Sequence, residues 1–96
     1  MKLSSEHIDR ALTQFDAQPI PENHPVVQKF NNLFGEHTYF LDQDGLNIVE
    51  PAESGDNNVE AGQVVKLASW VDDKRTALAP HEREQRDIVV VLGLAA

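Results

Sequence analysis

The chain has 96 residues, of which 41% are hydrophobic and 25% charged, and its formal net charge is −8. This length and composition predict one folded domain over residues 1–96, because there is apolar material for only one core. The absence of cysteine excludes disulfides, thiolate catalysis and thiolate zinc sites.

Two helices are predicted in the N-terminal third. The first covers residues 4–17, starts with serines suited to capping and ends before a proline-rich connector, QPIPENHP. The second runs from Pro25, a favoured first position, to Gly35, a favoured terminus. Its apolar side is the wider one, so we expect it to be more deeply buried than the first helix.

Four strands are predicted after Gly35, at residues 37–41, 46–50, 63–70 and 87–92, because these segments are rich in β-branched and aromatic residues. Helices that precede a run of strands indicate an α+β fold rather than alternating βαβ units. We therefore expect two N-terminal helices packed on one face of a mostly antiparallel four-stranded sheet.

Two long connections interrupt the predicted sheet, at residues 51–62 and 71–86. Connections longer than about 12 residues are uncommon in compact domains and often carry function. The second is dense in charge, and a short polar helix after Pro80 is one prediction for it. We expect function in these two segments.

The stretch DQDG, residues 42–45, raises the question of a calcium-binding loop. In the register that begins at Asp42, an EF-hand loop would have Leu46 at a ligand position, and a register that places Gly45 correctly begins at Phe40. A hairpin turn closed by Gly45 with a positive φ accounts for the same residues. We therefore predict a structural turn.

Other candidate sites are weaker. The four histidines lack the spacing of a zinc helix, the group HERE at residues 81–84 is interpreted as a charged loop, and no nucleophile elbow surrounds Ser69 or Thr76. A divalent-cation site is the alternative hypothesis, and it would use Asp42, Asp44, Glu53 or Asp56. A second candidate set of ligands for such a site is His81 with Glu82 and Glu84. A hydrolase is a third hypothesis, and it requires a pocket that brings a histidine to Ser69 or Thr76.

Residues 88–92 are continuously apolar, which predicts a strand that is buried on both faces. Two short helices on one face leave the other face open, so a folded-back 71–86 segment, curling of the sheet or a partner must cover it. Trp70 is the candidate anchor at such a surface, with core packing as the alternative.

Charge is unevenly distributed, because no Lys or Arg interrupts a run of seven acidic residues between Lys29 and Lys66. This region is expected to repel nucleic acid and to favour basic partners or cations, unless it is only a solvated surface. No apolar run approaches the ~18 residues of a membrane span, which predicts a soluble, cytoplasmic protein that binds no membrane.

The sequence thus predicts a small acidic interaction module without a cofactor. It would bind a protein partner, or itself as a homodimer, through an apolar sheet face or the 71–86 segment. The predicted partner-binding residues are Trp70, Lys74, Arg75 and His81.

Overall fold

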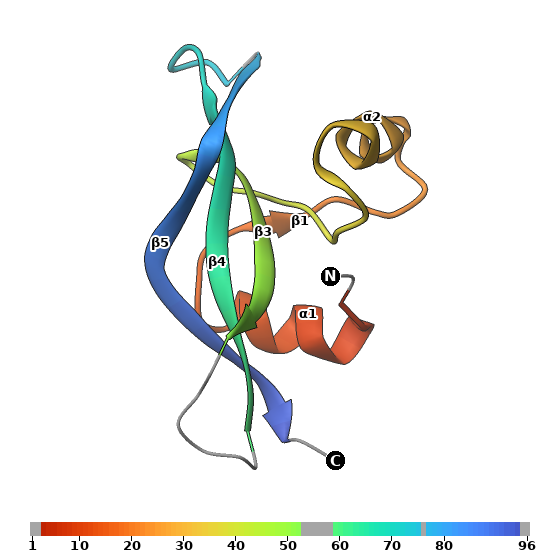
Figure 1. Ribbon diagram of the computed structural model, residues 1–96, viewed down its shortest axis with the longest axis vertical. Helices are drawn as coiled ribbons and strands as arrows, with labels where there is room; N and C mark the ends of the chain where they lie inside the picture. The colour runs from red at the N-terminus through yellow and green to blue at the C-terminus, as the bar shows by residue number, and fades with distance from the viewer. Residues whose placement is uncertain (1–2, 53–58, 76, 95–96) are drawn as a thin grey trace.

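The computed structural model describes residues 3–52, 59–75 and 77–94. Its elements are α1 (Ser5–Leu12), β1 (Gln18–Pro19), α2 (Pro25–Phe34), β2 (Phe40–Leu41), β3 (Gly45–Ala52), β4 (Val59–Trp70) and β5 (Leu78–Leu94). The strands form one antiparallel sheet in the order β1-β2-β3-β4-β5 (Figure 1). The α+β class is confirmed. The predicted number of strands is wrong, because the connector contributes the two-residue strand β1.

Local signals set the helix ends. The hydroxyl of Ser4 accepts a hydrogen bond from the amide of His7 at 3.2 Å, as an N-cap does. α1 ends five residues before the predicted limit, at Leu12, and the next residue, Thr13, donates its amide and its hydroxyl to the carbonyl of Arg10. The bounds of α2 match the prediction, with His24 as N-cap and Gly35 as C-cap at φ 92°.

The two helices pack on opposite faces of the sheet. Neighbouring residues of a strand point to opposite faces, and Val64 and Val65 of β4 belong to different hydrophobic clusters. The first cluster holds Leu3, Ala11, Phe15, Phe40, Val49, Val64, Val90 and Leu92, with Ile8 and Leu12 of α1 beside it. The second holds Val27, Tyr39, Leu46, Ile48, Val65, Leu67 and Ala68, with Phe30 and Phe34 of α2 beside it. The expectation of both helices on one face is therefore corrected.

The second apolar face of the sheet, which the sequence left without a cover, is partly covered by α2. α2 is nevertheless no more buried than α1: each has one fully buried residue, Val27 and Ala11, and Leu33 of α2 is 65% exposed. The expectation of a deeply buried second helix is wrong, because its contacts fall at the upper end of the sheet, near β1, rather than across it (Figure 1).

The segment between β4 and the predicted last strand is neither a helix nor a fold-back. From Leu78 onward it is the first half of β5, a 17-residue strand that pairs with β4 from Trp70 to Val59. The apolar run within β5 alternates, because Val90 and Leu92 are buried whereas Val89 and Val91 are 56% and 47% exposed. The prediction that this strand is buried on both faces is wrong for that reason.

Side chains from the N-terminal segment cover the outer edge of β5 near its C-terminal end. The side-chain amide of Gln14 donates to the carbonyl of Val91 at 2.7 Å and accepts from its amide at 2.6 Å. Arg10 donates to the carbonyl of Leu92 at 3.3 Å. These contacts satisfy backbone groups that an edge strand otherwise exposes.

Candidate functional site

The turn DQDG joins β2 to β3 and forms one wall of the site. Leu41 pairs with Leu46, the amide of Asp42 donates to the carbonyl of Gly45 at 3.0 Å, and Gly45 has φ 145°. One carboxylate oxygen of Asp42 accepts from the amides of Asp44 and Gly45 at 2.9 and 3.0 Å. The hairpin-turn prediction is confirmed.

Gly45 is required at this turn for a second reason besides its φ. A Cβ atom at this position would lie 2.1 Å from the carbonyl oxygen of Ala68 on β4. The turn therefore lies directly against β4, which brings Asp42 close to the hairpin formed by β4 and β5.

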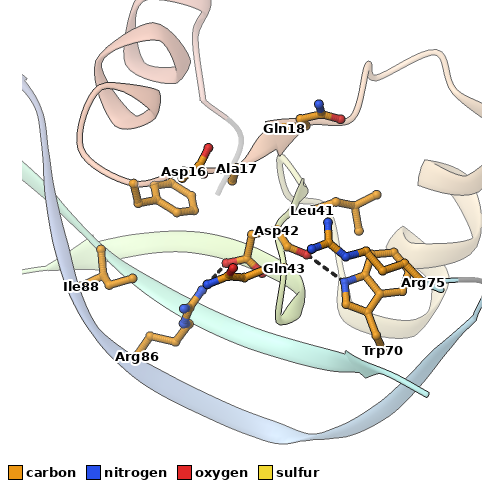
Figure 2. A pocket seen from close by; sticks show the side chains of 11 residues that line it. Asp16, Ala17, Gln18, Leu41, Asp42, Gln43, Trp70, Arg75, Arg86 and Ile88 are labelled. Atoms are coloured by element: carbon orange, nitrogen blue, oxygen red, sulfur yellow. Dashed lines mark hydrogen bonds and ion pairs between the residues drawn. The ribbon is translucent and has the colours of Figure 1, made fainter. Parts of the chain in front are cut away.

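Arg86 of β5 fastens the turn to that hairpin. Its guanidinium donates to the second carboxylate oxygen of Asp42, to Asp44 at 2.8 Å and to the side-chain oxygen of Asn47 at 3.3 Å. The Trp70 indole donates to the carbonyl of Asp42 at 2.8 Å (Figure 2). Asp42 is therefore bound on three sides, by the turn, by β4 and by β5.

The electrostatics of Asp42 follow from this environment. Desolvation by burial raises the pKa of its carboxyl, but hydrogen bonds from Arg86, Asp44 and Gly45, together with the charge of Arg86, lower it further than burial raises it. The net pKa lies below the ordinary value, so Asp42 stays ionised at neutral pH and its pair with Arg86 persists.

A bulge in β5 directs Arg86 at the turn. Gln63 pairs with Val89 and Val65 pairs with Gln85, so residues 86–88 of β5 lie opposite one residue of β4. The side-chain amide of Gln63 fills the bulge, donating to the carbonyl of Ile88 at 3.1 Å and to that of Arg86. The extra residues bend the strand and turn the Arg86 side chain toward the sheet.

Above this network is an open pocket of about 470 Å³. It lies between the segment from Phe15 to Gln18, the DQDG turn and the β4–β5 hairpin, so its walls come from three distant parts of the chain (Figure 2). The apolar lining residues are Phe15, Ala17, Leu41, Trp70 and Ile88, and the polar ones are Asp16, Gln18, Asp42, Gln43, Arg75 and Arg86. We call this the Trp70 pocket. Its volume falls in the usual range for small-ligand sites.

Two charged groups at the Trp70 pocket are unpaired. Arg75, which has φ 57°, and Asp16 are both exposed, and neither forms an ion pair with any of the residues that the structure describes. In Figure 2 Asp16 lies at the top of the pocket beside Ala17, whereas Arg75 lies on the side of Trp70. Arg86 and Asp42, in contrast, neutralise each other.

The structure brings together only part of the predicted partner-binding set. Trp70 and Arg75 line the Trp70 pocket, and the Trp70 ring both lines it and supports the turn. Lys74 and His81 do not line it. Sequence reasoning missed Asp16, Gln18 and Arg86. The sequence pointed to Arg86 only indirectly. Two aspartates in a tight turn require a cation nearby if the turn is buried, but the sequence does not show which cation that is.

The alternative cation site has few open ligands at this turn. Arg86 already binds both Asp42 and Asp44, so a metal ion here would have to displace its guanidinium. Residues 3–52, 59–75 and 77–94 contain no group of three or more His, Asp or Glu side chains arranged to hold a metal. Glu53 and Asp56 lie outside the described residues, so the cation hypothesis remains a prediction.

Each histidine has a separate local contact. His7 lies 3.2 Å from a carboxylate oxygen of Glu60, His24 caps α2, and the ring of His37 contacts the carbonyl of Phe34 at 3.1 Å. The fourth, His81, lies 3.0 Å from the hydroxyl of Ser69.

The pair of Ser69 and His81 bears on the hydrolase hypothesis. The ring of His81 also contacts the carbonyl of Glu82 at 2.6 Å, which orients it toward the serine. The three described pockets include neither residue in their lining, and the alternative nucleophile Thr76 lies outside the described residues. A nucleophile and base without a substrate pocket do not make the site that this hypothesis requires.

Some acids of the run between Lys29 and Lys66 have partners inside the fold. Asp42 and Asp44 pair with Arg86, Glu50 pairs with Arg83, and Glu60 contacts His7. This pairing offsets part of the negative charge that was expected to attract a basic partner, while Arg75 lies at the pocket without an ion pair to any described residue.

Fold and site together define a small α+β protein with one antiparallel sheet and an open, mixed polar and apolar pocket at the β4–β5 hairpin. None of its described helices has the length and apolar character needed to span a membrane. No protein-family model, curated protein or solved structure matches the chain.

Proposed function

We propose that the protein is a small binding module whose recognition site is the Trp70 pocket, and that a segment of a partner protein enters this pocket. The observation that carries the proposal is Arg75, an exposed cation without a carboxylate partner in the described chain, at a pocket with aromatic and aliphatic walls. Tryptophan and arginine are the residues most enriched among the energetic anchors of protein interfaces.

The partner segment would have two features. An apolar side chain would pack against Phe15, Leu41 or Ile88, and burial of this surface supplies the affinity at about 25 cal/mol per Å² before the costs of association. An acidic side chain would pair with Arg75 and fix the orientation of the segment. An acidic group is proposed here, in place of the basic partner expected from the sequence, because Arg75 lines the pocket without an ion-pair partner among the described residues, whereas Asp42 is paired with Arg86.

Association alone is sufficient for this function, and no covalent step is part of it. The pocket is held open by a rigid base, since Asp42, Arg86 and Trp70 are joined by hydrogen bonds that do not depend on a ligand. A preformed site avoids the cost of ordering its own side chains on binding.

Self-association is a second candidate, and the exposed valines of β5 favour it. Val89 and Val91 lie on the face of β5 that no helix covers among the described residues. If a homodimer forms through this face, Val89→Lys should weaken it and Arg75→Gln should leave it unchanged. Sedimentation of each variant at two protein concentrations measures the fraction of dimer. The patch is small, so the Trp70 pocket remains the principal proposal.

A selection experiment tests the pocket. A displayed library of random peptides is selected on the wild-type protein alone, and each enriched peptide is then tested for binding to wild type and to the Arg75→Gln variant. Binding is followed by the fluorescence of Trp70, the one tryptophan in the chain. The proposal expects enriched peptides with an acidic residue that alter this fluorescence. Enriched peptides that bind wild type and Arg75→Gln equally, with Trp70 unaffected, would rule the pocket out. Lys74→Gln, which changes the neighbouring exposed cation, is the matched control.

A further inference from the structure

Two opposite charges border the Trp70 pocket, on different sides of it, and neither has an ion-pair partner within residues 3–52, 59–75 and 77–94. Arg75 is on the side of Trp70, and Asp16 is on the side of the loop between α1 and β1 (Figure 2). The other two charged lining residues, Asp42 and Arg86, bind each other. A ligand in the pocket therefore meets one cation and one anion that have no ion-pair partner in the part of the chain that the structure describes.

We propose that the pocket selects a dipolar peptide segment, with an acidic side chain on Arg75, a basic side chain on Asp16 and an apolar residue between them. This inference rests on the proposed function of the Trp70 pocket and adds the charge pattern of its ligand. A segment with only an acidic group would leave the Asp16 carboxylate beside the bound chain without a counter-ion, which disfavours it relative to a segment that carries both charges.

The walls between the two charges support this pattern. Phe15 is buried at 7% exposure, and Ala17, Leu41 and Ile88 are partly buried, so apolar side chains form part of the wall between Asp16 and Arg75 in a lining that is otherwise polar. Gln18 and Gln43 are exposed at the rim, where their amides can bond to a peptide backbone of either direction. Apolar contacts thus lie between the two charge contacts.

Arg75 could instead be a structural residue that pairs with an acid of its own chain, but the ion pairs that the described residues form near the pocket do not include it. The ion pairs of the DQDG turn are made by Arg86, which binds both aspartates, and none of them involves Arg75. The neighbouring acid Asp73 forms no ion pair with Arg75 among the described residues, and the backbone amide of Arg75 donates to the carbonyl of Asp72 at 3.2 Å. The side chain of Arg75 has no structural partner in the chain that the structure describes.

The test uses peptides enriched in the selection described above, synthesised with capped ends so that only side chains carry charge. In each peptide the acidic residue is changed to its amide, the basic residue to glutamine, or both. Affinities are measured for wild type, Arg75→Gln and Asp16→Asn, with Lys74→Gln and Asp9→Asn as controls. All four positions are exposed, so the variants should fold, which circular dichroism verifies.

The proposal expects two matched couplings. Removing the peptide acid weakens binding to wild type roughly three- to tenfold and has no further effect on Arg75→Gln, as expected for one partly exposed ion pair. Removing the basic residue of the peptide weakens binding to wild type by a similar factor and does not weaken binding to Asp16→Asn any further. The control variants behave as wild type.

The outcomes separate the two proposals. Enriched peptides that lack a basic residue, or whose base does not couple to Asp16, would overturn the dipolar pattern while leaving the pocket itself in place. Peptides whose binding depends on neither Arg75 nor Asp16 would overturn both. A further check is the double variant Asp16→Lys/Arg75→Glu, which should prefer peptides with the two charges exchanged.

Discussion

The ion pair between Arg86 and Asp42 should contribute strongly to stability, and Arg86→Met tests this. The side chains of Arg86 and Asp42 are 19% and 5% exposed, so the substitution leaves a nearly buried carboxylate with only backbone partners. Breaking one side of a buried pair costs 3–5 kcal/mol in other proteins. Because Arg86 is partly exposed, we expect about 3 kcal/mol, measured by urea unfolding at pH 7. In a domain of this size that corresponds to a fall of roughly 12–24 °C in the melting temperature.

Arg83→Met is the matched control. Arg83 lies on the same strand and pairs with Glu50, but its side chain is 56% exposed, so its loss should cost less than about 1 kcal/mol. Equal losses for the two variants, or a loss under about 1 kcal/mol for Arg86→Met, would refute the role given to the buried pair.

The same variant has a pH dependence with a defined sign. Because the pKa of Asp42 is lowered in the folded protein, its contribution is complete above the unfolded pKa near 3.8 and is lost as the pH falls through the folded value. The stability difference between wild type and Arg86→Met should therefore be largest at neutral pH and shrink below about pH 4. A difference that is constant down to pH 3 would contradict this electrostatic explanation.

Three further predictions concern other parts of the fold. Burial raises the pKa of Tyr39, the only tyrosine, to about 12. Its ultraviolet titration should therefore have a midpoint near 12 in the folded protein and near 10 in urea, and a folded midpoint near 10 would contradict its burial. Gly45→Ala should cost about 3 kcal/mol, because the new Cβ meets the Ala68 carbonyl, and a loss under 1 kcal/mol by denaturant unfolding would show that the turn can move away. Gln14→Ala should cost about 1 kcal/mol and speed hydrogen exchange at the Val91 amide, whereas unchanged exchange would mean that Gln14 does not cover the edge.

The elements with local signals were predicted well. Pro25 and Gly35 gave the exact bounds of α2 because proline and glycine restrict the backbone at those two positions. The DQDG turn was predicted because Asp42 can bond to the amides that follow it and Gly45 can adopt φ 145°.

The length of β5 was not predicted, because its first half, from Leu78 to Arg86, has no alternation of apolar and polar residues. Backbone pairing with β4 makes this segment a strand although most of its side chains are exposed. The sequence showed that both faces of the sheet are apolar, but which helix covers which face depends on contacts distant in the chain. These contacts leave no periodic signal.

Only some residues that line the Trp70 pocket were named from the sequence, for the same reason. Trp70 was named because tryptophan is common at interfaces, and Arg75 because it lies in the charged segment that follows Trp70. Both line the pocket. Arg86 was missed because its partners lie 42 and 44 residues away, and its direction depends on a bulge that the sequence does not mark.

The most direct test of the Trp70 pocket is an amide and indole NMR map of the labelled protein with a selected peptide. If the Trp70 pocket binds the peptide, the Trp70 indole signal and the amides of Phe15, Gln18 and Gln43 shift together and saturate, while those of Val89 and Val91 stay in place. Shifts confined to Val89 and Val91 would instead mean that recognition occurs on the outer face of β5.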